Sequence, residues 1–170
     1  MKSQEEIKNK FNRNVKVLNL KPKLGLGKAV STIRITNGLT CEIKEGDWKL
    51  KTDMSEQVGG SSSAPSPGVL GRAALGSCLA SGYMMWASNL DIVIDSLEIK
   101  IEADYDDGAL FGTSDVPAGY SQVQYHVKIN SPHSRNEIED FLDSADKHSP
   151  YLDVFSRAQH CKRKLELNNQ

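Results

Sequence analysis

The feature that most constrains this chain is one long apolar stretch, which runs from Pro67 to about Leu90 without an internal proline. Ser66-Pro67 is typical of a helix start, because a serine can cap free N–H groups and a proline suits the first helical turn. The stretch therefore predicts a single long helix that begins at Pro67.

The apolar residues of this predicted helix cover most of its circumference rather than one face. They are Val69, Leu70, Ala73, Ala74, Leu75, Leu79, Met84, Met85 and Trp86. A helix that is apolar nearly all round is buried on most sides. Small residues such as Gly71, Gly76 and Gly82 let other backbones come close. We therefore expect a sheet to wrap this helix or a partner subunit to cover it.

Strand patterns precede the helix. Residues 29–43 carry apolar residues on both sides of Asn37-Gly38, a strong hairpin signal. Glu45-Gly46-Asp47 forms a second turn, and residues 48–53 alternate again, so we predict an antiparallel three-strand meander. Residues 1–28 are polar and lysine-rich, and we expect an extended or partly helical arm there.

Further strands and helices follow the long helix. Residues 92–105 and 120–130 alternate, and Ser134 with Glu137 forms a capping box for a second helix that ends near His148. A short helix over 151–156 and a final strand near 159–167 complete the prediction. This order predicts an α+β fold, with an antiparallel sheet wrapped around the long helix and one domain over 29–170.

The overall composition excludes several classes of protein. The length of 170 residues suits one domain, and the formal charge of −1 gives no overall attraction to nucleic acid or membranes. No apolar run approaches the roughly 18–20 residues of a membrane span, and the first residues lack the apolar stretch of a signal peptide. Three cysteines are too few and odd in number for a disulfide framework, so we expect a reducing compartment, the cytoplasm.

Several motifs that would carry chemistry are incomplete. Residues 25–28 (Gly-Leu-Gly-Lys) lack the first glycine and the final Ser/Thr of a phosphate loop. Residues 104–108 lack the spacing and terminal glutamate of a calcium loop, and His160-Cys161 has no second ligand pair nearby for zinc. No G-x-S-x-G motif is present. We expect neither a metal nor a cofactor.

Cys78, on the predicted long helix, remains as a candidate for chemistry. A buried cysteine on an apolar helix usually acts as a small hydrophobic residue. A reactive cysteine needs surroundings that favour the thiolate, such as a nearby arginine or histidine. The pattern alone therefore favours a structural role.

Two stretches change this interpretation. The first spans residues 59–80 and includes Ala73-Ala74-Leu75-Gly76-Ser77-Cys78-Leu79; the second is Ala145-Asp146-Lys147-His148-Ser149-Pro150-Tyr151. Together they resemble the signatures of the OsmC/Ohr superfamily, which comprises osmotically induced and organic-hydroperoxide-resistance proteins. Residues 106–119 resemble one OsmC-like branch, and the resemblance runs from about residue 29 to 167.

The resemblance implies an interlocked homodimer with two sites at the subunit interface. It also implies a reaction in which a cysteine thiolate attacks the distal oxygen of a hydroperoxide and becomes a sulfenic acid. A second cysteine then forms a disulfide with it, which a cellular thiol reduces. An arginine and a glutamate assist the first cysteine.

Carried over by position, this mechanism is incomplete. Cys78 matches the peroxidatic cysteine, but Ser149 stands where peroxidase members have the second cysteine, and a serine cannot form a disulfide. Gly68 stands where they have the glutamate. Arg72, one helical turn further on, is either a stand-in charge or a surface or dimer-contact arginine, and Arg34 is the only arginine of the early strands.

Either of the other cysteines is a candidate substitute for the second cysteine. Cys161 begins the predicted last strand and Cys41 lies on an early strand. A disulfide from either one to Cys78 needs a Cα separation of roughly 4–7 Å.

Three functional hypotheses follow. The first is a thiol-dependent hydroperoxide reductase that uses Cys78 with His148 nearby and an external thiol. The second is a non-catalytic protein that binds a small apolar or lipid-like molecule in a pocket formed by Cys78, Gly68, Met85, Trp86, His148 and Tyr151. The third is a hydrolase or transferase that uses Ser149 with His148, although the side chains of adjacent residues tend to diverge.

Overall fold

The computed structural model describes residues 3–167, and its N-terminal arm is mostly helical. Helix α1 (Gln4–Leu20) begins with a capping box, in which the Ser3 hydroxyl accepts the Glu6 N–H and the Glu6 carboxylate accepts the Ser3 N–H. A 3₁₀ turn at Pro22–Gly25 follows. The partly helical arm expected for residues 1–28 is thus largely the helix α1.

The three-strand meander forms as the sequence predicts. Strands β1 (Thr32–Asn37), β2 (Thr40–Glu45) and β3 (Trp48–Thr52) pair antiparallel in the order β1-β2-β3. Gly38 and Gly46, in the two turns, have φ of 53° and 55°, a left-handed conformation that glycine adopts without steric cost. The tight turns fix the register, which pairs Ile33 with Ile43 and Ile43 with Leu50.

The loop between β3 and the long helix is organised by one buried carboxylate. Asp53 is 1% exposed and accepts hydrogen bonds from the N–H groups of Met54, Ser61 and Ser63 and from the Ser63 hydroxyl. These bonds, with the Ser63 N–H bond foremost, hold the pKa of Asp53 below its usual value. Gly60 is required in this loop, because a Cβ there would collide with the Met54 carbonyl.

Helix α2 (Pro67–Asn89) is the long helix that the sequence predicts. Ser66 is its N-cap residue, but the Ser66 side chain makes no capping hydrogen bond, so the expected serine cap is wrong in that detail. Most of the circumference of α2 is apolar, but one side of it is fully buried. The residues at most 1% exposed follow a spacing of four: Leu75, Leu79, Tyr83 and Ala87. Other α2 residues, including Val69 and Met85, stay more than 40% exposed.

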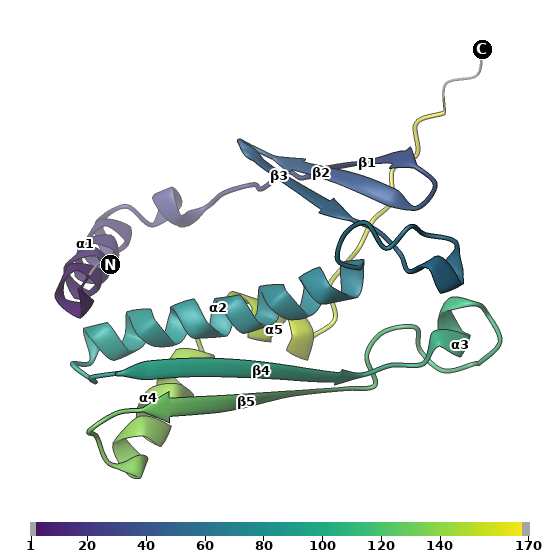
Figure 1. Cartoon of the computed structure of the whole chain (residues 1–170). Coiled ribbons are helices and arrows are strands. Elements are labelled where there is room, and N and C mark those ends of the chain that lie inside the picture. Colours follow the sequence, from purple (N-terminus) through teal and green to yellow (C-terminus); the bar gives the residue numbers. More distant parts are fainter. Residues whose placement is uncertain (1–2, 168–170) are drawn as a thin grey trace.

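Strands β4 (Ser96–Asp104) and β5 (Gln122–Asn130) form a second, two-stranded antiparallel sheet. Half-buried and exposed residues alternate along both strands, and the half-buried ones pack on the core of α2. The connection between the strands includes the short helix α3 (Asp107–Leu110). Figure 1 shows both strands running along α2.

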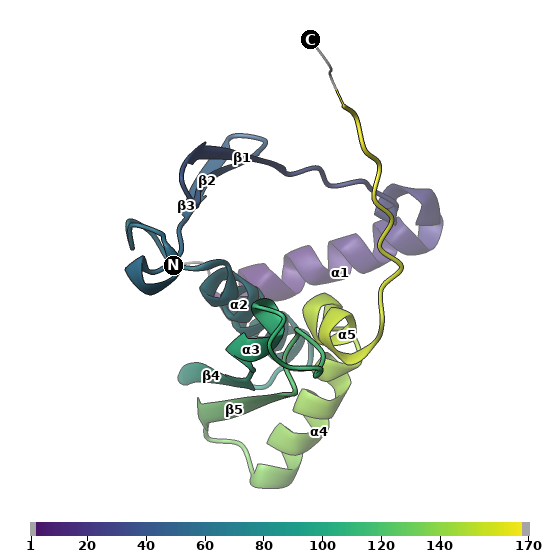
Figure 2. The ribbon, with the colours of Figure 1, turned by 90° about the vertical axis from the view of Figure 1, so that its right-hand side faces the viewer.

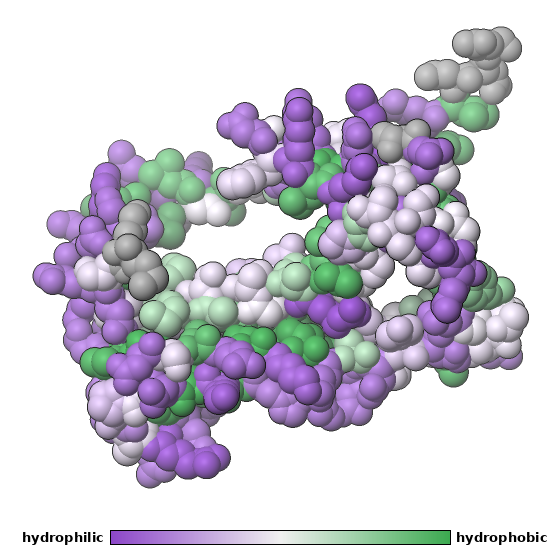
Figure 3. Space-filling view, in the orientation of Figure 1, coloured by the Kyte–Doolittle hydropathy of each residue, from purple (hydrophilic) through white to green (hydrophobic). Residues whose placement is uncertain are grey.

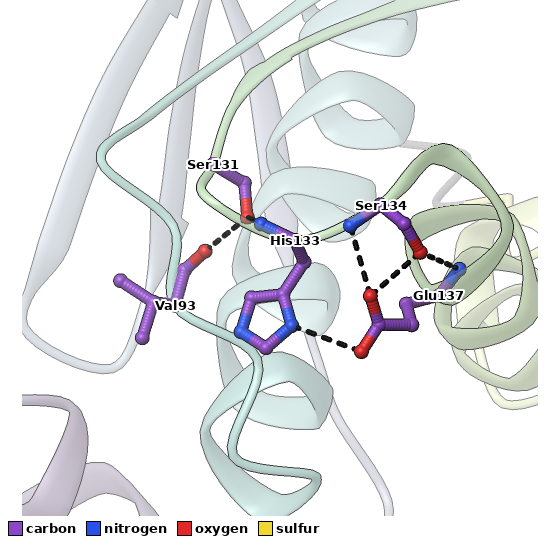
Figure 4. Close-up of polar contacts among 5 residues, drawn as sticks. All are labelled: Val93, Ser131, His133, Ser134 and Glu137. Atoms are coloured by element: carbon purple, nitrogen blue, oxygen red, sulfur yellow. Dashed lines mark hydrogen bonds and ion pairs between the residues drawn. The ribbon is translucent and has the colours of Figure 1, made fainter.

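Helix α4 (Arg135–Asp146) carries the capping box that the sequence predicts. The Ser134 hydroxyl accepts the Glu137 N–H, and the Glu137 carboxylate accepts both the N–H and the hydroxyl of Ser134 (Figure 4). Next to it, the Ser131 hydroxyl donates to the Val93 carbonyl at 2.6 Å, which ties the start of α4 to the end of the α2–β4 loop. Helix α5 (Pro150–Ser156) follows.

The strand predicted near residues 159–167 is not formed. Residues 157–167 have no regular secondary structure, and in Figure 2 this yellow segment runs away from the body of the molecule. A strand requires a neighbour for its N–H and C=O groups, and in the described residues no edge of either sheet reaches this segment. The prediction was wrong for a single chain because the pattern does not supply the pairing partner.

Of the two separate sheets, the β4–β5 sheet is the one that packs on α2. Figure 2 shows α1 and α5 on one side of α2 and the β4–β5 sheet on the other. The meander β1–β2–β3 stands off the helix, and Figure 3 shows an opening between the two. The fold class is the predicted α+β class with antiparallel sheets, but one chain leaves part of the long helix uncovered.

Candidate functional site

The structure brings together the two positions that the sequence singled out most strongly. Cys78 lies half-buried on α2, and Ser149 lies in the short turn between α4 and α5. The Cys78 sulfur and the Ser149 hydroxyl oxygen are 3.8 Å apart, and Ser149 is only 6% exposed. Residues 71 positions apart in the sequence therefore face each other in the fold.

Ser149 is held firmly by its own backbone neighbours. Its N–H donates to the Asp146 carbonyl at 3.1 Å, and its hydroxyl oxygen accepts the Leu152 N–H at 3.4 Å, as the N-cap of α5. The hydroxyl hydrogen of Ser149 can still be donated to the Cys78 sulfur, because a serine hydroxyl can accept and donate at the same time. Ser149 can thus donate a hydrogen bond to a Cys78 thiolate, although it cannot bond covalently to it as a cysteine would.

His148 lies beside the pair but makes other contacts. Its Nδ1–H donates to the Ser144 carbonyl at 2.8 Å, and its ring lies against the Trp86 ring with centroids 4.5 Å apart. The His148 and Ser149 side chains therefore diverge, as expected for adjacent residues. This arrangement gives no support to the third hypothesis, in which His148 activates the Ser149 hydroxyl.

Arg72 does not act on Cys78 in the described structure. Its Nη1 donates to the Tyr120 hydroxyl at 3.1 Å, and that hydroxyl donates to the Gly68 carbonyl at 3.3 Å. A Cβ built on Gly68 would lie 3.3 Å from Arg72 Nη1 and 3.6 Å from Tyr120 Oη. Tyr120 thus lies where a side chain at position 68 would meet Arg72. No local pattern in the sequence indicates this role of Tyr120.

A half-buried carboxylate within the second signature has a role that sequence reasoning missed. Asp146 accepts hydrogen bonds from the hydroxyls of Tyr83 on α2, at 2.6 Å, and Tyr125 on β5, at 2.8 Å. Burial, with these bonds to Asp146, raises the pKa of Tyr83 and raises that of Tyr125 to about 12. Because Ser149 follows three residues later, this network fixes the turn that carries Ser149 against α2 and β5.

The remaining candidate residues are described by their exposure and their place in the fold. Met85 and Tyr151 are each 44% exposed, and Trp86 is half-buried between His148 and the ring of Phe11. All three cysteines are free, with Cys41 on β2 and Cys161 exposed in the segment after α5. Arg34 pairs across the sheet with Glu42 on β2. Within residues 3–167, no three His, Cys, Asp or Glu side chains gather to hold a metal.

A comparison with protein families shows the family to which the chain belongs. The OsmC-like protein family matches residues 59–163, which contain α2, both strands of the second sheet and the Cys78–Ser149 pair. The match covers more than half of the chain, so this protein belongs to the OsmC-like family. A comparison with curated protein sequences finds no match.

Solved structures agree with this assignment at the level of the fold. An OsmC-like protein from Mycoplasma pneumoniae aligns with a TM-score of 0.67 at 18% identity, covering 76% of this chain and 88% of that one. An organic hydroperoxide resistance protein OsmC from Legionella pneumophila aligns at 0.59 and 21% identity, over 77% and 90%. An organic hydroperoxide resistance protein from Elizabethkingia anophelis aligns with a TM-score of 0.55 at 18% identity, covering 76% of this chain and 88% of that one.

The family match confirms the resemblance seen in the sequence, and the structural likenesses confirm the predicted α+β fold. Several of the structural neighbours are named as organic hydroperoxide resistance proteins. Within the described residues, no helix combines the length and the apolar character needed to cross a membrane.

Proposed function

We propose that this protein is a thiol-dependent hydroperoxide reductase that acts through Cys78 alone. The observation that carries the proposal is the Cys78–Ser149 contact, at 3.8 Å between sulfur and oxygen. The positions of the family's cysteine pair face each other, but the second position offers a hydroxyl. Ser149 then stabilises a thiolate by hydrogen bonding, and the disulfide step passes to a separate thiol in a reducing compartment such as the cytoplasm.

The first step consumes the hydroperoxide. The Cys78 thiolate attacks the distal oxygen, so an S–O bond forms as the O–O bond breaks. The departing alkoxide takes a proton and leaves as an alcohol, while the sulfur loses the two electrons that the peroxide gains. The product on the protein is a sulfenic acid.

The second step restores the thiol without a second protein cysteine. A small thiol displaces water from the sulfenic acid and gives a mixed disulfide with Cys78. A second small thiol attacks this disulfide, which releases the Cys78 thiolate and an oxidised thiol dimer. The reaction therefore requires two external thiols for each hydroperoxide.

The decisive experiment exposes reduced protein to cumene hydroperoxide and traps the sulfenic acid with dimedone for mass spectrometry. We expect a trapped adduct at Cys78 and turnover of peroxide in the presence of dithiothreitol, with both lost in Cys78→Ser. Cys161→Ser is the matched control and keeps both, because Cys161 is exposed on another segment. Full retention of the Cys78 thiol in excess peroxide would overturn the proposal.

Substitutions at Ser149 test the contact itself. Ser149→Cys is expected to convert the site to the two-cysteine type, so that peroxide yields an internal disulfide and no dimedone adduct. Ser149→Ala removes the donated hydrogen bond, and the Cys78 oxidation rate should fall about ten- to a hundredfold, since a hydrogen bond to a charged group contributes roughly 1.5–3 kcal/mol. If Ser149→Cys forms no disulfide on oxidation, the pairing is not the one proposed.

A binding function is the second candidate, and one observation favours it. A Cβ built on Gly82, one turn after Cys78 on α2, would meet no atom of another element within 4 Å, so the helix surface at Gly82 is open. Met85 and Tyr151 are also partly exposed. An apolar or lipid-like molecule retained by the gently purified protein in native mass spectrometry, together with an unreactive Cys78, would favour this function.

We also propose that the working protein is a homodimer. The exposed apolar residues of the meander, such as Ile35 and Leu50, and those of α2, such as Val69, would be buried by a second copy. Light scattering should then give twice the 18.7 kDa chain mass. A mass equal to that of one chain at micromolar concentration would rule the dimer out.

A further inference from the structure

Helix α1 and the 3₁₀ turn after it concentrate positive charge in a chain that is otherwise acidic. Residues 7–30 contain seven lysine and arginine residues and no aspartate or glutamate, whereas the whole chain has a formal charge of −1, so the other residues together carry −8. Within residues 3–167, Lys8 is the one of these seven that forms an ion pair, with Asp91. The other six are exposed: Lys10, Arg13, Lys16, Lys21, Lys23 and Lys28.

The same segment carries an apolar stripe that α2 covers only in part. Ile7, Phe11, Val15 and Leu18 follow helical spacing and so lie on one face of α1. Ile7 and Phe11 are half-buried, and the Phe11 ring meets the Trp86 ring of α2 edge-on. Val15 and Leu18, further along, are 44% and 41% exposed. Figure 2 shows α1 starting beside α2 and running beyond it, which leaves the far half of the stripe uncovered.

The 3₁₀ turn at Pro22–Gly25 enlarges this uncovered end. A Cβ built on Gly25 would lie 3.3 Å from Leu18 Cδ2, so the turn folds back beside Leu18. Leu24 and Leu26, on either side of Gly25, are 64% and 81% exposed. Figure 3 shows apolar surface next to hydrophilic surface over this turn. We call the following exposed residues the arm tip: Val15, Leu18, Leu24 and Leu26 with Lys16, Lys21, Lys23 and Lys28.

The mixture of leucines and lysines in the arm tip distinguishes between possible partners. The core of a protein–protein interface is depleted in lysine, because an ammonium group buried there loses its water. Nucleic acid would pair with the lysines but leave the leucines in water. A lipid surface accommodates both, because leucines enter the boundary of the acyl chains while lysine stems lie along it and their ammonium groups meet the phosphates.

We propose that the arm tip binds the surface of an anionic phospholipid membrane. The charge asymmetry orients the molecule, with the basic arm toward the lipid and the acidic remainder away from it. The start of α1 holds the arm on the fold, because Gln4 Nε2 donates to the Ile92 carbonyl at 2.8 Å and Lys8 pairs with Asp91. The binding is peripheral and reversible, and salt weakens it.

Vesicle flotation of the full-length protein tests the proposal. We expect binding to vesicles made of equal parts of phosphatidylcholine and phosphatidylglycerol, and none to phosphatidylcholine alone. Lys21→Gln with Lys23→Gln should weaken the affinity about 25-fold, because each lysine near an anionic surface contributes about fivefold. Leu24→Ser with Leu26→Ser should weaken it about tenfold, because two apolar side chains no longer enter the lipid boundary.

Two double variants elsewhere on the surface are the matched controls. Lys128→Gln with Lys147→Gln removes the same charge from exposed positions on β5 and after α4, and the affinity should stay within about twofold of the wild type. Leu110→Ser with Val116→Ser removes exposed apolar residues between β4 and β5, and the affinity should not change. Circular dichroism checks that all four variants keep the fold, which is expected because every substituted residue is exposed.

Three results would overturn the proposal. The first is no binding to the anionic vesicles at low salt, or equal weakening by the control variants. The second is wild-type vesicle binding by Leu24→Ser with Leu26→Ser together with competition by duplex DNA, which would make the arm tip a nucleic-acid site. The third is a fall in the light-scattering mass from two chains to one in that leucine variant, which would make the arm tip a subunit contact. None of these results bears on the reductase function, since Cys78 is not part of the arm.

Discussion

The α2–β4–β5 half of the molecule and the β1–β2–β3 meander have similar alternating strands, but they bury them very differently. In the first half, alternate residues of β4 and β5 pack on a core that includes Leu79 and Phe141, at 0% and 2% exposure. In the meander, Ile35 is 63% and Leu50 53% exposed. Alternation creates an apolar face on a strand, but another element has to cover that face before it contributes to stability.

The candidate site lies where these two differently buried regions meet. Cys78 sits on α2 at the border between the packed half and the uncovered side, so it is half-buried. Ser149 reaches it from the packed half, held by α4, α5 and the Asp146 network. A rigid scaffold on one side and an exposed side on the other fit the proposed function, in which the thiol is both held in place and reached by a hydroperoxide.

The largest expected effect comes from the packed half. Leu79→Ala should lower the free energy of unfolding by about 2–5 kcal/mol, because it leaves a cavity where a fully buried side chain packs. Urea denaturation followed by circular dichroism measures the change.

Leu50→Ala in the meander is the matched substitution on an exposed leucine. In dilute protein it should change the free energy of unfolding by less than about 0.5 kcal/mol. A loss that grows with protein concentration would show that a second copy covers the meander, and equal losses for the two leucines in dilute protein would contradict the comparison.

The next effect concerns the partly buried hydrogen bond between Tyr83 on α2 and Asp146 on α4. Tyr83→Phe should lower the free energy of unfolding by about 1.5–3 kcal/mol, because the Asp146 carboxylate then keeps only the Tyr125 hydroxyl of its two tyrosine donors. The raised pKa of Tyr83 means that its contribution is complete below the ordinary tyrosine pKa of about 10 and is lost as the pH rises further.

Stability measured between pH 8 and pH 11 checks both parts of this prediction. Tyr83→Phe should show a shallower alkaline loss than the wild type. A double-mutant cycle with Asp146→Asn should give a coupling energy well above zero, whereas additive effects would mean that the bond contributes nothing.

A smaller, local effect is expected where the two halves join. Asp53→Asn removes the negative charge of the side chain that accepts hydrogen bonds from the N–H groups of Met54, Ser61 and Ser63. Hydrogen exchange at Ser61 and Ser63 should become faster, while exchange in the core of α2 stays unchanged. Unaltered exchange in this loop would show that Asp53 does not hold it.

The smallest effect lies at the start of α4. The Ser134 side chain, with its N–H and His133, lowers the pKa of Glu137 to about 2. Because the folded pKa is depressed, this contribution to stability is present above the ordinary glutamate pKa of about 4.3 and is lost as the pH falls toward 2. Glu137→Gln should flatten the stability profile slightly between pH 5 and pH 2, and an unchanged acid profile would contradict the prediction.

Much of the fold could be predicted from local patterns in the sequence. The Asn37-Gly38 turn predicted the hairpin, Pro67 predicted the start of α2, and Ser134 with Glu137 predicted the capping box of α4. Each of these depends on residues within a few positions of one another. The final strand near residues 159–167 failed because its hydrogen-bonding partner is not specified by a local pattern.

Only part of the candidate site could be predicted from the sequence. Cys78 and Ser149 emerged from the family resemblance, but the roles of Tyr120, which holds Arg72, and of Asp146, which binds two tyrosines, did not. Phe11 lay in an arm that the sequence marked only as polar and lysine-rich. A hydrogen bond or ring contact between distant segments leaves no periodic signal in the sequence.

The sequence by itself determined the long helix with Cys78, the strands that flank it and the family to which the chain belongs. Helix and strand choices follow from side-chain periodicity, caps and turns, which act over one or two turns of chain. Only the tertiary structure decided that the Ser149 hydroxyl faces the Cys78 sulfur and that α1 reaches Trp86. Such contacts depend on how whole elements pack, because packing brings together residues that no local rule connects.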